Sequence, residues 1–117
     1  MLKTISTVEY SEGVKKSANL TRLQQTTNRL RELANDDQDM VSLHILWDED
    51  ASLRESDFGK YILNISVSKN GKQRRFPVYF SRDELTSTAT VDSRLHRALA
   101  SIFHTMAEDE LRHLSTN

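Results

Sequence analysis

The chain has 117 residues, 37% of them hydrophobic, with 16 Lys and Arg against 17 Asp and Glu and a net charge of −1. This length is enough for one ordinary domain, which we assign to residues 1–117, and too short for two. The lack of cysteine excludes disulfides, thiolate metal sites and thiol catalysis, and no apolar run approaches the roughly 18 residues that a membrane helix needs.

The first predicted helix covers residues 17–35. Its apolar residues recur at the three- and four-residue spacing of an amphipathic helix: Ala18, Leu20, Leu23, Leu30, Leu33 and Ala34. Three serines are each suited to cap its start, namely Ser6, Ser11 and Ser17, and Glu9 follows the first of them as in a capping box. The turn-forming residues 35–37 end the helix. The pattern predicts no regular element for residues 1–12, which can therefore be irregular.

A strand and a hairpin follow. Residues 41–48 alternate between apolar and polar types, as in a half-buried strand, and an acidic loop covers residues 48–59. Asn70-Gly71 then separates two further strands, residues 60–68 and 72–81, and is typical of a two-residue hairpin turn. This turn pairs Lys69 with Lys72 and places the apolar residues of both strands on one face.

Pro77 indicates where the hairpin lies in the sheet. Pro77 has no N–H group, and opposite Asn64 this missing group would point away from the hairpin partner. A further strand on that side would lack a hydrogen bond, so we expect the third strand to be an edge. Ser81 and Glu84 form a second capping box, and residues 92–114 carry the apolar stripe of a final helix, with a frayed tail at residues 115–117. The predicted fold is a two-layer α+β domain, α-β-β-β-α, in which two helices cover one face of a three-stranded antiparallel meander of order 1-2-3.

Charge is unevenly distributed along the chain. The net charges of residues 1–35, 36–57, 58–82 and 83–117 are +3, −7, +6 and −3. Such clusters produce local fields that the near-zero total conceals. We therefore predict that the protein docks charged surfaces on a protein partner, through basic and aromatic hairpin residues and the neighbouring acidic loop: Lys69, Lys72, Arg74, Arg75, Tyr79, Asp48, Asp50, Glu55 and Asp57.

No catalytic constellation or cofactor motif is evident, so the main hypothesis is a small cytoplasmic, non-enzymatic adaptor, regulator or inhibitor that needs no cofactor. This localisation rests on the lack of a signal peptide's hydrophobic stretch in residues 1–10. Nucleic-acid binding, with the basic hairpin on phosphates, is an alternative. A metal-dependent enzyme built on the histidines is a second one, and the short heptad pattern of Leu20, Leu23 and Leu30 leaves a homodimer open.

Overall fold

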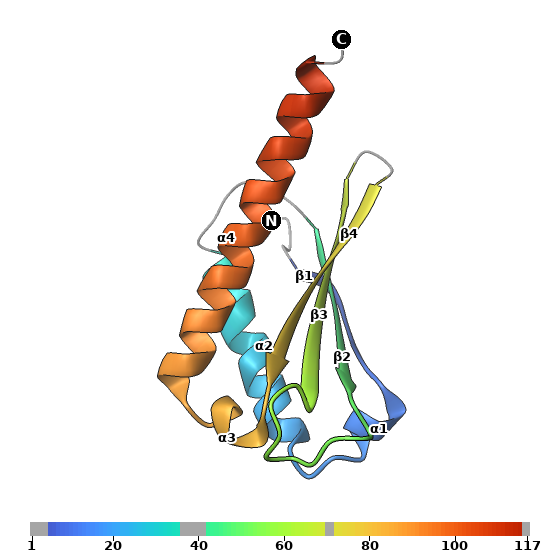
Figure 1. The fold of residues 1–117 in the computed structure, drawn as a ribbon, viewed down its shortest axis with the longest axis vertical. Coiled ribbons are helices and arrows are strands. Elements are labelled where there is room, and N and C mark those ends of the chain that lie inside the picture. Colours follow the sequence, from blue (N-terminus) through green and yellow to red (C-terminus); the bar gives the residue numbers. More distant parts are fainter. Residues whose placement is uncertain (1–4, 36–41, 70–71, 116–117) are drawn as a thin grey trace.

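The computed structural model of the protein describes residues 5–35, 42–69 and 72–115. In chain order the elements are β1 (Ile5–Tyr10), α1 (Glu12–Lys15), α2 (Leu20–Asn35), β2 (Leu43–Glu49), β3 (Tyr61–Lys69), β4 (Lys72–Phe80), α3 (Arg82–Leu85) and α4 (Thr88–Ser115). The protein is an α+β domain in which α2 and α4 lie on the same side of the sheet (Figure 1).

The antiparallel part of the sheet agrees with the sequence analysis. Strand β3 pairs with β2 and β4, and the register of the hairpin, from Lys69 opposite Lys72 to Tyr61 opposite Phe80, is the predicted one. Pro77 lies opposite Asn64, and β4 is an edge strand. The Asn70-Gly71 turn that predicted this register lies outside the described residues.

The prediction of a three-stranded meander is wrong in one respect, because the sheet has a fourth strand. Residues 5–10 form β1, which pairs with β2 in parallel, so the sheet is mixed and its order is β1-β2-β3-β4. The expected capping box at Ser6 is therefore part of a strand. Ser11 instead caps the short helix α1, and α2 begins at Leu20. A parallel pair needs a long crossover, and α1 and α2 supply it here.

An irregularity in β1 hides the alternation of a strand in its sequence. The pairing shifts register between Ile5 and Thr7, as at a β-bulge. Ile5 is buried, and Val8 and Tyr10 pack against the same core. A regular strand puts residues of one face two positions apart, so the three-residue step from Ile5 to Val8 hides the alternation.

The core lies between the sheet and the two long helices. Leu23 and Leu30 of α2 and Leu95 and Ile102 of α4 are fully buried there. Trp47 of β2 is also fully buried, with its ring centroid 6.1 Å from that of Phe80. Leu23 and Leu30 are buried in the chain's own core, and Leu20 is half-buried. These three leucines therefore leave little apolar surface on α2 for the homodimer that the heptad pattern left open.

Helix α4 has 28 residues, a length of about 42 Å, and runs beyond the end of α2 beside the hairpin (Figure 1). Among the described residues, hydrogen bonds join it to β4 at two points. The guanidinium of Arg94 donates to the backbone carbonyl of Tyr79 at 2.7 Å, and Arg74 forms a two-pronged ion pair with Asp109 at 2.8 and 3.1 Å. No helix in the described part of the chain is long and apolar enough to cross a membrane.

Candidate functional site

The basic residues predicted on the hairpin do not form a single exposed cluster. Arg74 and Arg75 are adjacent in β4, so their side chains point to opposite faces of the sheet. Arg74 faces α4 and pairs with Asp109, whereas Arg75 is exposed on the opposite face, which no helix of the described residues covers. The side chains of Lys69 and Lys72 lie outside the described part of the structure. Among the predicted basic residues whose side chains the structure describes, Arg75 is thus the one that is available to a partner.

The acidic loop is folded on itself by hydrogen bonds. Asp50 accepts from the backbone N–H and the hydroxyl of Ser52 at 3.0 and 2.6 Å, and these bonds lower the pKa of its carboxyl group. Asp57 accepts from the N–H of Arg54 at 2.9 Å. The other two predicted acidic contacts also have partners, since Glu55 pairs with Arg82 and Asp48 accepts from the N–H of Glu49. These carboxylates are therefore already partly satisfied within the chain.

His44 and His104 lie in separate places. The Nδ1 atom of His44 contacts the hydroxyl oxygens of Ser6 and Thr7 at 3.1 and 2.9 Å on the uncovered face of the sheet. His104 pairs with Glu108, four residues later on α4, at 2.8 Å. Among the described residues, no three His, Asp or Glu side chains come together as a group that could hold a metal ion.

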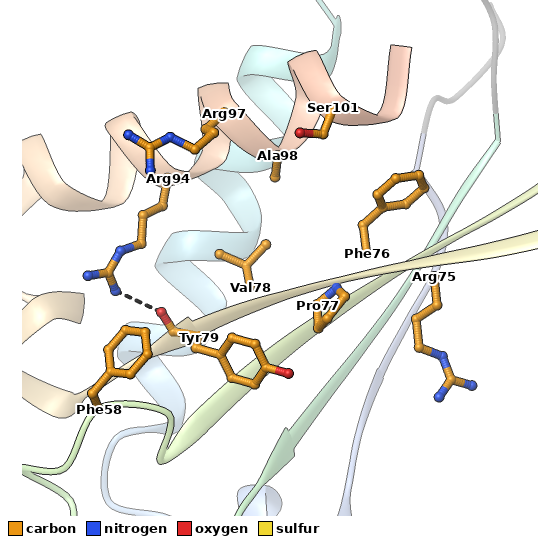
Figure 2. A pocket seen from close by; sticks show the side chains of 10 residues that line it. All are labelled: Phe58, Arg75, Phe76, Pro77, Val78, Tyr79, Arg94, Arg97, Ala98 and Ser101. Atoms are coloured by element: carbon orange, nitrogen blue, oxygen red, sulfur yellow. Dashed lines mark hydrogen bonds between the residues drawn. The ribbon is translucent and has the colours of Figure 1, made fainter. Parts of the chain in front are cut away.

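The structure instead reveals a groove between the edge strand β4 and α4, with a volume of about 320 Å³. Five consecutive residues of β4 line one side, Arg75, Phe76, Pro77, Val78 and Tyr79, and the other side comes from Arg94, Arg97, Ala98 and Ser101 of α4, with Phe58 at one end. Figure 2 shows Phe76 and Val78 directed toward α4 and Pro77 and Tyr79 on the opposite side of the strand. We call this site the β4–α4 groove.

The sequence of α4 explains why a groove forms here. Residues 94, 97, 98 and 101 follow the helical repeat and share one face. Ala98 and Ser101 are small, so space remains between helix and strand in the interval between the two points where α4 is joined to β4. Two aromatic side chains stay exposed at the Arg94 end: Phe58 is 64% exposed and Tyr79 41%, and their ring centroids are 6.2 Å apart.

The charged residues that line the groove all have the same sign. Its charged lining residues, within the described part of the chain, are Arg75, Arg94 and Arg97. Arg94 is held by an ion pair with Glu84 and lies over the rings of Phe58 and Phe80 at 5.3 and 5.4 Å. Arg75 and Arg97 are exposed and have no ion-pair partner among the described residues. An apolar floor with two unpaired cations at its rim suits an anionic ligand.

Sequence reasoning identified only part of this site. It named Arg75 and Tyr79, but missed Phe58 and the contribution of α4. The helical spacing of Arg94, Arg97 and Ser101 was visible in the sequence, although nothing local indicated that this face lies beside an edge strand. Comparisons with protein-family models, with curated proteins and with solved structures find no match to this chain.

Proposed function

We propose that the protein is a small cytoplasmic, non-enzymatic binding module that acts as an adaptor, regulator or inhibitor by docking an acidic region of a protein partner in the β4–α4 groove. The observation that carries this proposal is the combination of exposed aromatic rings with unpaired arginines around one apolar groove. Tyrosine and arginine are enriched among the residues that contribute most to protein–protein binding.

The number of available cations favours a protein over a nucleic acid. Arg94 is occupied by Glu84, and Arg74 by Asp109, which leaves Arg75 and Arg97 as the unpaired cations among the described lining residues. Two cations are far fewer than the roughly 6–10 phosphate contacts of a protein whose binding to nucleic acid depends steeply on salt. In addition, Phe58 belongs to the acidic loop of residues 48–59, which would repel a polyanion that continued past this end of the groove.

Affinity capture with charge-reversed variants tests the proposal. The groove variant carries Arg75→Glu and Arg97→Glu, and its control carries Arg22→Glu and Arg31→Glu, two exposed arginines of α2 away from the groove with the same change in net charge. Partners retained by the wild-type chain from a native lysate would be identified by mass spectrometry, purified and titrated back. We expect the wild-type and control chains to bind the partner equally and the groove variant to bind it at least tenfold more weakly.

Equal binding by the groove and control variants would contradict the proposed site. Labelled single-stranded and duplex oligonucleotides are titrated in parallel at low salt. If they bind the wild-type chain, if binding declines steeply with added salt, and if the groove variant loses it, then the ligand is a nucleic acid and the proposed protein partner is wrong.

A further inference from the structure

We infer that the acidic region of the partner binds as an extended peptide strand that adds to the free edge of β4. This inference rests on the proposed function and specifies how the partner is recognised. It follows from three features of the groove. Backbone groups of β4 have no partner among the described residues, Arg94 closes one end of the edge, and the side chains differ on the two sides of the strand.

The edge of β4 exposes backbone groups along the groove. In an antiparallel hairpin whose register pairs Lys69 with Lys72, alternate residues of β4 direct their N–H and C=O groups away from β3. By this count Arg75, Pro77 and Tyr79 face outward. The bond from Arg94 to the carbonyl oxygen of Tyr79 agrees with the count, because that oxygen is accessible from α4. All three residues line the groove.

The two ends of this edge differ. At Tyr79 the carbonyl oxygen is already occupied by Arg94, which also donates to Glu84 and lies over Phe58. Pro77 has no N–H to offer. Within the groove, the outward groups that remain for a partner strand are thus the N–H and C=O of Arg75, the C=O of Pro77 and the N–H of Tyr79. These four groups define a short docking segment that ends at Arg94.

The side chains beside the edge define the chemistry of the peptide. Successive residues of an added strand would alternate between the α4 side, next to Phe76 and Val78, and the uncovered side, next to Pro77 and Tyr79 (Figure 2). The small residues Ala98 and Ser101 leave room for an apolar side chain on the α4 side. Arg97 lies on that side and Arg75 on the other. The ligand is therefore an extended segment with an apolar residue flanked by carboxylates.

A second copy of this chain fits the edge poorly. Pairing β4 with β4 would bring the unpaired Arg75 and Arg97 of one copy toward those of the other, and like charges at close range repel. Pro77 would also leave a gap in the hydrogen bonds of both copies. An acidic segment instead neutralises the same arginines, so charge complementarity selects a peptide of opposite sign.

A selection from a displayed library of random nonapeptides on the full chain tests this inference. We expect enrichment of Asp and Glu around an apolar residue, and at least a tenfold weaker affinity of the selected peptide for the Arg75→Glu, Arg97→Glu variant than for the Arg22→Glu, Arg31→Glu control. Two versions of the peptide, N-methylated at odd or at even positions, then probe the backbone. Only the set whose N–H groups face β4 is expected to lose binding, by at least tenfold, while the amide resonances of Arg75 and Tyr79 shift on binding of the unmodified peptide.

The outcomes separate the binding mode from the proposed function. If the acidic peptide binds in the groove but both N-methylated versions bind equally well, strand addition is wrong and the protein-binding function stands. If the library yields no acidic peptide while the native partner still depends on Arg75 and Arg97, the partner binds through a folded surface and this inference is again overturned. A stable dimer in sedimentation that the groove variant abolishes would assign the edge to a second copy.

Discussion

Thr27 shows how a single polar residue is accommodated in the core. Its hydroxyl donates to the carbonyl oxygen of Leu23, one helical turn earlier, at 2.9 Å and accepts from the indole N–H of Trp47 at 2.7 Å. Both Thr27 and Trp47 are buried, so each hydrogen bond is made away from water. The threonine thereby fixes α2 against β2 while leaving no buried donor unsatisfied at this point.

Replacing this hydroxyl by a methyl group tests its contribution. In Thr27→Val the shape is nearly kept, but the indole N–H of Trp47 loses its acceptor, which should cost about 1–3 kcal/mol in the free energy of unfolding. Urea denaturation followed by far-ultraviolet circular dichroism measures this loss. Thr21→Val, an exposed site on the same helix, is the control and should change stability by less than about 0.5 kcal/mol. Equal losses at the two sites would show that the hydrogen bond is unimportant.

Between elements, two ion pairs fix the first half of α4. Arg29 of α2 binds Asp92 with two hydrogen bonds of 2.8 and 3.0 Å, and Arg94 pairs with Glu84 of α3. The bond from Arg29 lowers the pKa of the Asp92 carboxyl group below its usual 3.8, and the bond from Arg94 lowers the pKa of the Glu84 carboxyl group below its usual 4.5. Folding therefore favours the ionised form of both groups.

This preference predicts how stability depends on pH. Above the ordinary carboxyl pKa values the two pairs contribute fully, because the groups are ionised in both the folded and the unfolded chain. As the pH falls, the unfolded chain takes up protons first, and the contribution is lost as the pH passes through the lowered pKa values of the folded chain. We expect the Asp92→Asn, Glu84→Gln variant to lose less unfolding free energy than the wild type between pH 6 and pH 3. Parallel curves from urea titrations would contradict this assignment.

The elements differed in how much of their structure the sequence could predict. The hairpin was predicted in its correct register because a local turn signal and the pairing of apolar residues agreed. The strand β1 was missed because the bulge between Ile5 and Thr7 disrupts its alternation, and because its partner β2 lies far along the chain. For the groove, the sequence supplied Arg75 and Tyr79. Arg97 joins them only through the packing of α4 beside β4, and Phe58 only because its loop folds back against Tyr79.

At the scale of the whole molecule, the C-terminal part of α4, around Asp109, supports the hairpin near Arg74. The described structure measures 50 × 28 × 22 Å, and its long axis follows α4 (Figure 1). The Arg74–Asp109 pair connects this part of the helix to β4, with Asp109 at 18% side-chain exposure. Together with the Arg94 contact it holds the two walls of the β4–α4 groove at a fixed separation.

Breaking the Arg74–Asp109 pair should loosen the hairpin without unfolding the protein. In Asp109→Ala, we expect faster amide hydrogen exchange in the last turns of α4 and in the hairpin end of β3 and β4, with a change in global stability of at most about 1 kcal/mol. Hydrogen exchange followed by mass spectrometry measures both regions. Glu108→Ala is the matched control, because the residues that Glu108 contacts, His104 and Arg112, are on its own helix. The idea fails if both variants exchange alike.

The burial of Trp47 also has a practical consequence, since it is the chain's single tryptophan. Its fluorescence comes from one site, which lies where α2, β2 and Phe80 meet. Emission from an indole shielded from water is expected at short wavelength, and it should shift to the red when solvent enters this junction. The protein therefore carries an intrinsic optical reporter of the separation of its two layers, which needs no added dye.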